Sequence, residues 1–223
     1  MLPSTCTGNT AVTGASVKVI NDTNGSEFIF ADQNNGEYTT MDFEPIVSNS
    51  YTLEIIHNGE TYSATETLNA VPDITNINQA TEDGFDDEAL EVHVFFMDPP
   101  EEGNHYLFKF RKQGELLPEL EEFNDEFING NEVDWWYELE EDETTDGSEG
   151  FVPGDVVEIE LYATSEQYND YMRILINQSG VSGPFDTTPV ALKGNCVNLT
   201  NADNYAHGYF RLTEVNKTSY TFE

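Results

Sequence analysis

Three consecutive aromatic residues, Trp135-Trp136-Tyr137, have the side chains best suited to hold a ligand. The faces of indole and phenol rings stack on the apolar faces of sugar rings, but aromatic residues also build hydrophobic cores. Two interpretations therefore stand: a sugar-binding platform, or one tryptophan in the core with the other at its rim. The core interpretation is the ordinary one, and all three residues stay ligand candidates.

Carboxylates are the most abundant reactive groups in the chain. There are 43 Asp and Glu against 8 Lys and Arg, which gives a net charge of -35 and a pI of about 4.1. Residues 76–150 carry 24 of the acids and 3 of the bases. Solvated acidic loops are the ordinary explanation of such a stretch, and binding of a hard cation is the alternative.

Residues 142–153 test the cation alternative against the calcium-loop pattern. Asp142 and Asp146 fit two ligand positions of an EF-hand, but Thr144 fails a third and Pro153 stands where the bidentate Glu belongs. The spacing therefore excludes an EF-hand. An irregular Ca²⁺ site at Asp142, Asp146 and Glu149 stays open, and we expect no other cofactor.

No motif for enzymatic catalysis is present. The four histidines form no metal-binding pair, and we interpret His93 as a packed or rim histidine within a strand. Residues 180–184 (GVSGP) resemble a nucleophile elbow, but Pro184 replaces its last glycine and a predicted helix precedes it. A hydrolase built on a carboxylate pair is a third hypothesis. We expect a protein that is not an enzyme.

The charge and the apolar runs exclude several partners. A chain this acidic repels nucleic-acid phosphates and anionic lipid headgroups. No apolar run approaches the roughly 20 residues that span a bilayer. The first residues (MLPSTCTG) contain no signal-peptide pattern, so we expect either a cytoplasmic protein or a trimmed N-terminus. The strand pattern that begins within about fifteen residues favours the trimmed N-terminus. Cys6 and Cys196 are the only cysteines. A disulfide between them and a free thiol at Cys196 are both open.

Short alternating runs and turn signals predict antiparallel strands in the first third of the chain. Residues 16–21, 26–31 and 50–57 alternate apolar and polar residues, and Asn58-Gly59 predicts a type I′ hairpin to a partner strand at residues 60–68. Proline at the Val71-Pro72 step ends this pattern. We therefore predict a small β-sandwich over residues 1–74 and a larger β domain over residues 75–223.

The second part combines strands with the single helical period of the chain. Strands are predicted at residues 90–97, 106–111, 133–139 and 155–163. Tyr168, Met172 and Leu175 then share one apolar stripe, after a capping signal at Thr164. The stripe predicts a helix over residues 165–178 that packs on one sheet with these three side chains buried.

An ordered set of motifs resembles domain-of-unknown-function family 4249. The segments that carry the resemblance span nearly the whole chain: residues 13–17 with 36–38, 51–53, 58–62, 71–74, 125–130, 154–162, 183–185, 193–195, 197–201 and 205–210. The last segments are the most specific. Cys196 and His207 depart from the family pattern, and the signal peptide and lipidated cysteine of the family are absent from these residues.

The resemblance implies an Ig-like β-sandwich followed by a second antiparallel β domain. It also implies a lipid-anchored protein on the outer-membrane surface of Gram-negative bacteria, often encoded beside TonB-dependent transporters, and no established catalytic residues. We expect an accessory that captures a ligand for such a transporter, monomeric when isolated. A stand-alone adhesion or glycan-binding module is the alternative. The glycine-rich C-terminal segment adds Phe185 and Tyr209 as partner candidates.

Overall fold

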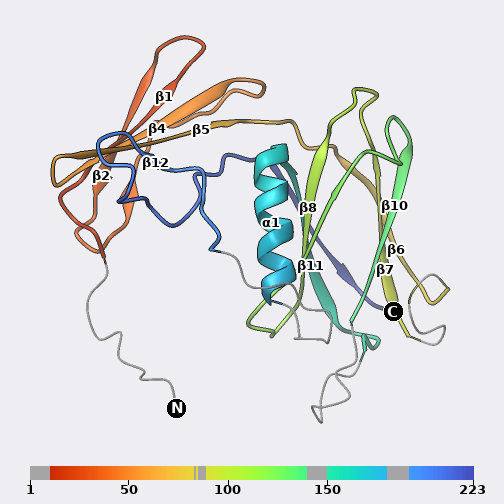
Figure 1. Ribbon diagram of the computed structural model, residues 1–223. Coiled ribbons are helices and arrows are strands. Elements are labelled where there is room, and N and C mark those ends of the chain that lie inside the picture. The colour runs from red at the N-terminus through yellow and green to blue at the C-terminus, as the bar shows by residue number, and fades with distance from the viewer. Residues whose placement is uncertain (1–10, 83, 85–88, 140–149, 180–190) are drawn as a thin grey trace. The chain divides into compact units, whose positions relative to one another are not determined.

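The computed structural model describes residues 11–82, 84, 89–139, 150–179 and 191–223. Within them the chain is mainly β, with antiparallel strand pairs and one helix (Figure 1). It divides into two compact units. The first comprises Met1–Leu68 with Ala191–Leu212, and the second comprises Asn69–Val190 with Thr213–Glu223.

The first unit contains one antiparallel sheet of six strands. The strands are β1 (Ser16–Asn21), β2 (Glu27–Asp32), β3 (Tyr38–Thr39), β4 (Ser50–His57), β5 (Glu60–Thr67) and β12 (Val197–Asn198), in the order β12-β5-β4-β1-β2-β3. Asn58 and Gly59 both have positive φ, at 52° and 80°, so the hairpin between β4 and β5 has the predicted type I′ turn. Val17, Val19 and Tyr51 are buried on one face of this sheet.

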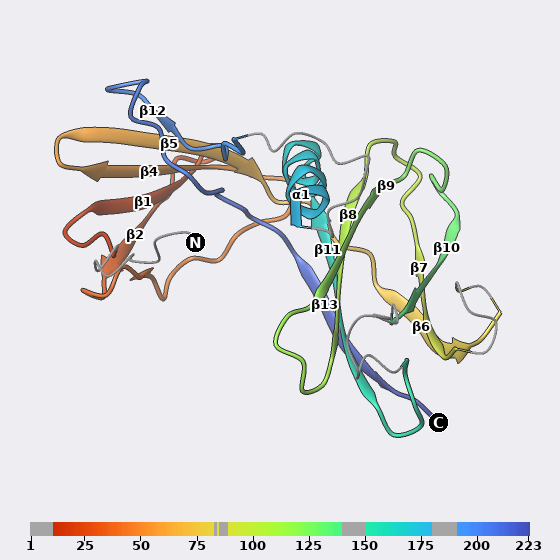
Figure 2. The same ribbon diagram turned by 60° about the horizontal axis from the view of Figure 1, so that its bottom comes forward.

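The second unit is a sandwich of two antiparallel sheets, which Figure 2 shows face to face. One sheet has the order β10-β7-β6, and the other has the order β13-β11-β8-β9. Their bounds are β6 (Ile74–Ala80), β7 (Glu91–Met97), β8 (His105–Lys112), β9 (Glu119–Asn124), β10 (Glu132–Glu138), β11 (Val156–Thr164) and β13 (Val215–Thr221).

The core of the second unit follows from the alternation of its strands. Val92, Val94 and Phe96 of β7 face Phe108 and Phe110 of β8, and all five are fully buried. The prediction of a mainly β chain with antiparallel sheets, an Ig-like sandwich and one helix is confirmed. The two facing sheets of the sandwich lie in the second unit, whereas the sequence analysis placed a sandwich in residues 1–74.

The helix α1 spans Glu166–Ser179 and packs along β8 and β9 (Figure 1). It begins one residue later than the capping signal indicated, because the Ser165 hydroxyl accepts the Tyr168 amide. Tyr168 and Met172 are buried as predicted, whereas Leu175 is 40% exposed. The prediction for Leu175 is wrong because the buried stripe is narrower than the apolar one, and the buried polar residue Asn169 lies on it instead.

The side chain of Asn169 explains how the helix is fixed on the sheet. Its amide donates to the carbonyl oxygens of Tyr106 at 2.9 Å and Phe123 at 3.2 Å. These hydrogen bonds fix one turn of the helix against β8 and β9. The apolar period alone did not identify this residue.

The two units differ from the division predicted at residue 74. After Val190, in the second unit, the chain returns to the first sheet, where Val197 and Asn198 of β12 pair with Ser63 and Tyr62 of β5. The predicted second domain therefore loses residues 191–212 to the first unit. No local sequence pattern indicates pairing between segments more than 130 residues apart. The sequence analysis therefore assigned residues 191–212 to the same domain as their neighbours along the chain.

Cys196 is a free, half-buried thiol, and its partial burial raises the pKa of the thiol. Cys6 lies outside the described residues. No helix in the described part of the chain is long and apolar enough to cross a membrane.

Glu160 of β11 is the centre of a charge network on the four-stranded sheet. Burial raises the pKa of this carboxyl, but the hydrogen bonds from Lys217, Tyr162 and Lys109 outweigh burial and lower the pKa from 4.5 to about 2. Because the folded pKa lies below the unfolded one, the stabilisation is complete above pH 4.5 and is lost as the pH falls through about 2.

Replacing Glu160 by glutamine is therefore expected to lower the free energy of unfolding by about 2 kcal/mol at pH 7 and by almost nothing at pH 2. Urea unfolding at pH 7, 4 and 2 measures this difference. Glu158→Gln is the control, because Glu158 lies two residues away on the same strand and pairs with Arg111 while 44% exposed. Its replacement should change stability by less than about 0.5 kcal/mol. Equal effects of the two substitutions would contradict the network.

Candidate functional site

An open cleft lies between two edge strands of the second unit. β9 ends the four-stranded sheet and β10 ends the three-stranded sheet, so neither has a further strand beside it among the residues that the structure describes. Between them the structure has a cavity of about 540 Å³. The described residues that line it all come from these two strands: Glu119, Leu120, Glu121, Asp134, Trp135, Trp136, Tyr137 and Glu138. We name this space the β9–β10 cleft.

The wall formed by β9 presents carboxylates toward the interior of the sandwich. Glu119 and Glu121 stand opposite Phe110 and Phe108 of β8, and both phenylalanines are core residues. Paired residues share one face of a sheet, so the two glutamates lie on the inner face of an edge strand. Charges in this position oppose the addition of a further strand. The cleft is therefore better suited to a compact ligand than to an extended chain.

The wall formed by β10 contributes the aromatic surface. Trp135 stacks on Phe123 with ring centroids 4.0 Å apart and donates its indole N–H to Glu121. Trp136, the next residue, points to the other face of the sheet. Both indoles are half-buried, and they are the only two tryptophans of the chain.

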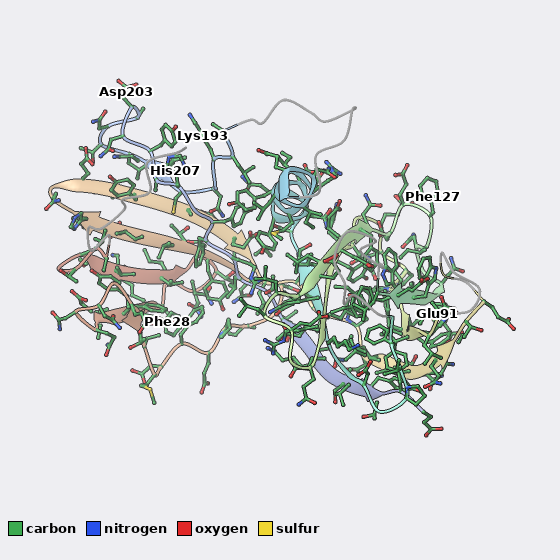
Figure 3. The ribbon with its side chains drawn as sticks, turned by 90° about the horizontal axis from the view of Figure 1, so that it is seen from below. Phe28, Glu91, Phe127, Lys193, Asp203 and His207 are labelled. Carbon is green, nitrogen blue, oxygen red and sulfur yellow. The ribbon has the colours of Figure 1, made fainter. Side chains whose placement is uncertain are left out.

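Beside Trp136, on the same face of the sheet, lies a group of charged side chains in which Glu91 and His93 are buried and Asp134 is exposed. His93 of β7 pairs with Trp136 across the strands. Its Nδ1 lies 2.7 Å from Oδ1 of Asp134, and its Nε2 lies 3.2 Å from Oε1 of Glu91. Glu91 is fully buried and His93 is 3% exposed (Glu91 is labelled in Figure 3). Burial disfavours the imidazolium, but the two carboxylates outweigh it, so the pKa of His93 is raised.

The sequence interpretation of His93 as a packed histidine missed this arrangement. The alternation of β7 does place Glu91 and His93 on one face, and Asp134 and Trp136 share a face of β10. Only the register between the two strands, with Trp136 opposite His93, brings these pairs together.

A second region with defined side-chain contacts lies in the first unit. The return segment, residues 191–212, folds against β5, and Figure 3 labels Lys193, Asp203 and His207 on it. The Asn195 side chain donates to the Phe210 carbonyl at 2.9 Å and accepts the Phe210 amide at 2.8 Å. It therefore pairs with Phe210 in the way that a neighbouring strand would.

Glu60 is the acceptor that fixes the outer part of the return segment. Its carboxylate accepts the Tyr62 hydroxyl at 2.8 Å and the amide of Asn198 at 3.2 Å, and also the amides of Asn201 and Asn204. The bond from Tyr62 is the main reason that the pKa of Glu60 is lowered, and the asparagine amides add to it. The segment is thus held as a defined loop on the edge of the first sheet.

A family model described as "Domain of unknown function (DUF4249)" matches residues 4–219. The chain belongs to this family. The resemblance found in the sequence is therefore confirmed.

Several motifs that carry the DUF4249 resemblance have structural roles in the described chain. Asn195 and Asn198 of the C-terminal motifs hold the return segment. Asp125 of the mid-chain motif accepts the amides of Gly103 and Asn104 at 2.8 and 2.9 Å, which fixes two neighbouring loops to each other. These motif residues stabilise the fold.

Comparison with curated proteins gives this DUF4249 chain no match. Among solved structures, a segment of two fibronectin type III domains from chicken tenascin matches with 11% sequence identity and a TM-score of 0.28. The match covers 70% of this chain and 79% of the tenascin segment.

The structure brings together only part of the predicted site of the DUF4249 chain. Trp135 and Trp136 line the β9–β10 cleft, but on opposite faces of β10. Tyr137 is 4% exposed and stacks on Phe110 at 4.3 Å, so it contributes to the core as well as to the cleft. Tyr209 belongs to the return segment of the first unit. The sequence analysis did not select Glu119 and Glu121.

The remaining candidates lie outside the described residues. These are Phe185 and the three calcium candidates Asp142, Asp146 and Glu149. In the part of the chain that the structure describes, no group of three or more His, Cys, Asp or Glu side chains has the arrangement of a metal site.

Proposed function

We propose that this DUF4249 chain is the ligand-capturing part of an outer-membrane surface lipoprotein, that it is not an enzyme, and that it serves a TonB-dependent transporter. The observation that carries the capture role is the β9–β10 cleft. Its volume of about 540 Å³ lies within the range of small-molecule sites, and it combines aromatic surface with polar groups. The lipid anchor and the transporter come from what the family resemblance implies.

The construction of the cleft supports binding. Trp135 is held by Phe123 and by Glu121, so its ring is fixed before a ligand arrives. Such preorganisation lowers the entropy lost on association. The two edge strands belong to sheets that pack on one aromatic core, so the walls are stiff.

The transporter partnership is tested with the full-length, lipid-anchored protein. Cross-linking in intact outer membranes followed by affinity purification should recover a TonB-dependent transporter in stoichiometric yield. A parallel purification after signal-peptide removal, which keeps the protein off the membrane, gives the background. Recovery of no transporter above that background would reject the partnership.

The alternative, a glycan-binding module, is favoured by the two half-buried indoles. On a glycan array, Trp136→Ala should then reduce binding at least tenfold, because stacking on that ring is lost. Phe127→Ala is the matched control, since Phe127 is an aromatic residue of the same unit that is 89% exposed and lies outside the cleft lining. Equal glycan binding by both variants would show that the cleft takes no part in glycan recognition. Release of product from any bound glycan would instead support the hydrolase hypothesis.

A further inference from the structure

The hairpin between β8 and β9 ends in an exposed apolar tip. Leu116 is 89% exposed, and the adjacent Leu117 is 75% exposed. Five large apolar side chains of the described chain are more than 70% exposed, and these two are the only ones among the five that are adjacent in the sequence. Single exposed apolar residues are ordinary, whereas contiguous ones form a patch that is more often functional. We name residues 113–118 the β8–β9 tip.

The backbone at the base of the tip is fixed, so the two leucines are presented in a defined position. The Gln113 amide donates to the Val156 carbonyl of β11 at 2.8 Å. The Glu115 amide donates to the Lys112 carbonyl at 3.1 Å, and the Lys112 ammonium pairs with Asp155 at 2.7 Å. A loop that is already ordered loses less entropy when a partner binds, so the tip is suited to act as an anchor.

A further exposed apolar residue lies at the same end of the four-stranded sheet. The loop before β11 contains Val152, which is 48% exposed, and the ion pair between Asp155 and Lys112 joins this loop to the base of the tip. Figure 2 shows the tip and this loop at the same end of the sheet. The other end of β9 leads into a separate loop, where Phe127 is 89% exposed.

The charges around the tip have a negative balance. Residues 111–119, 151–158 and 221–223 lie at this end of the sheet, and they contain five acids and two bases. Both bases already form ion pairs, Arg111 with Glu158 and Lys112 with Asp155. A partner surface is therefore complementary when lysines or arginines border the apolar pocket that receives the tip. The same charges repel anionic lipid headgroups.

We propose that the β8–β9 tip docks into an apolar pocket with a basic rim on the TonB-dependent transporter. This inference rests on the proposed function, because the transporter is the partner proposed there. Leu116 and Leu117 enter the pocket as the anchor of the interface, and the surrounding acids orient the two proteins and raise the rate of encounter. A lipid surface would extend beyond the tip and bring all five acids close to the headgroups, whereas a pocket receives the two leucines alone.

The test uses the full-length, lipid-anchored protein in intact outer membranes. After cross-linking and affinity purification, Leu116→Ser/Leu117→Ser should recover at least tenfold less transporter than wild type, because the interface loses two buried leucines. Phe127→Ser is the matched control, since it replaces an equally exposed apolar residue at the other end of β9, and its recovery should stay within twofold of wild type. Urea unfolding of both variants should match wild type, because the replaced side chains are exposed.

A photo-activatable side chain gives a second measurement that does not depend on affinity. Leu116→p-benzoylphenylalanine should cross-link to the transporter, and Phe127→p-benzoylphenylalanine should not. If the leucine variant recovers as much transporter as wild type or as Phe127→Ser, the proposal is overturned and the transporter partnership stands. If wild type recovers no transporter, the partnership is rejected and the proposal with it. Flotation of the 223-residue chain with phosphatidylcholine vesicles, lost in the leucine variant, would overturn it in favour of a membrane contact.

Discussion

Replacing His93 by glutamine is expected to lower the free energy of unfolding by about 3 kcal/mol at pH 6, and by progressively less as the pH rises. His93 is 3% exposed and lies between Glu91, which is fully buried, and Asp134. Removing one partner from a buried ionic group leaves the other charge uncompensated, which typically costs about 3 to 5 kcal/mol. A glutamine amide replaces one of these hydrogen bonds but supplies no positive charge.

The pH dependence follows from the direction of the pKa shift. The folded state raises the pKa of His93 above the ordinary value of 6.5, so the folded protein holds this proton more tightly than the unfolded chain. The resulting stabilisation is complete below about pH 6.5 and is lost as the pH rises through the folded pKa. At higher pH the wild type also has a neutral side chain at this position, and the two proteins converge in stability.

Two measurements check this expectation. Urea unfolding of both proteins between pH 5.5 and 9 gives the stability difference, and an NMR titration of the His93 ring gives its pKa directly. Glu91→Gln should shift that pKa downward, because one of the two carboxylates is lost. His105→Gln is the control, since the His105 ring bonds the Gly103 carbonyl and is less buried. A His93 ring that titrates below 6.5 would contradict the expectation.

His93 also shows which features of the fold could not be predicted from the sequence. Alternation along single strands predicted which residues share a face, and the Asn58-Gly59 turn and the start and end of the helix are equally local features. These were confirmed to within a residue or two. Which face of β7 meets which face of β10 depends on register, and 34 residues separate the two strands along the chain. No local pattern determines that pairing.

The candidate site was predicted in part for the same reason. Trp135 and Trp136 were selected by residue type, and both do line the cleft. Glu119 and Glu121 were not selected as site candidates from the 24 acids in residues 76–150, because only the structure shows that they occupy the inner face of an edge strand. Buried Asn169 and Asn195 were missed as well, since an asparagine fixed by backbone groups has the same sequence signature as one in a loop.

The second large effect concerns the return segment, where Gly194→Ala is expected to lower the free energy of unfolding by about 3 kcal/mol. A Cβ atom on Gly194 would lie 1.4 Å from the Gly208 carbonyl oxygen and 2.3 Å from its carbon. Both contacts are with backbone, so no side-chain rotation relieves them, and the backbone at Gly194 or at Gly208 must move. Forced expansion of a packed contact costs about 1 to 3 kcal/mol, occasionally more.

The movement would also break the neighbouring pair. Asn195 and Phe210 exchange two hydrogen bonds of 2.9 and 2.8 Å, and they lie directly beside the Gly194–Gly208 contact. Asn195 is 9% exposed, so its amide has little access to water once Phe210 moves away. The loss of packing and the loss of these bonds therefore act on the same few residues, and the whole return segment should loosen from β5.

Limited trypsin digestion reports this loosening directly, because Lys193 and Arg211 lie near the two ends of the segment. Cleavage at these residues should accelerate at least tenfold in Gly194→Ala, together with the loss of stability in urea. Gly150→Ala is the matched control, since a Cβ on Gly150 meets nothing within 4 Å, and its stability should stay within about 0.5 kcal/mol of wild type. If Gly194→Ala digests and unfolds like Gly150→Ala, the close approach of Gly194 to Gly208 does not hold the segment. The C-terminal motifs of the family would then have a role other than holding the return segment on β5.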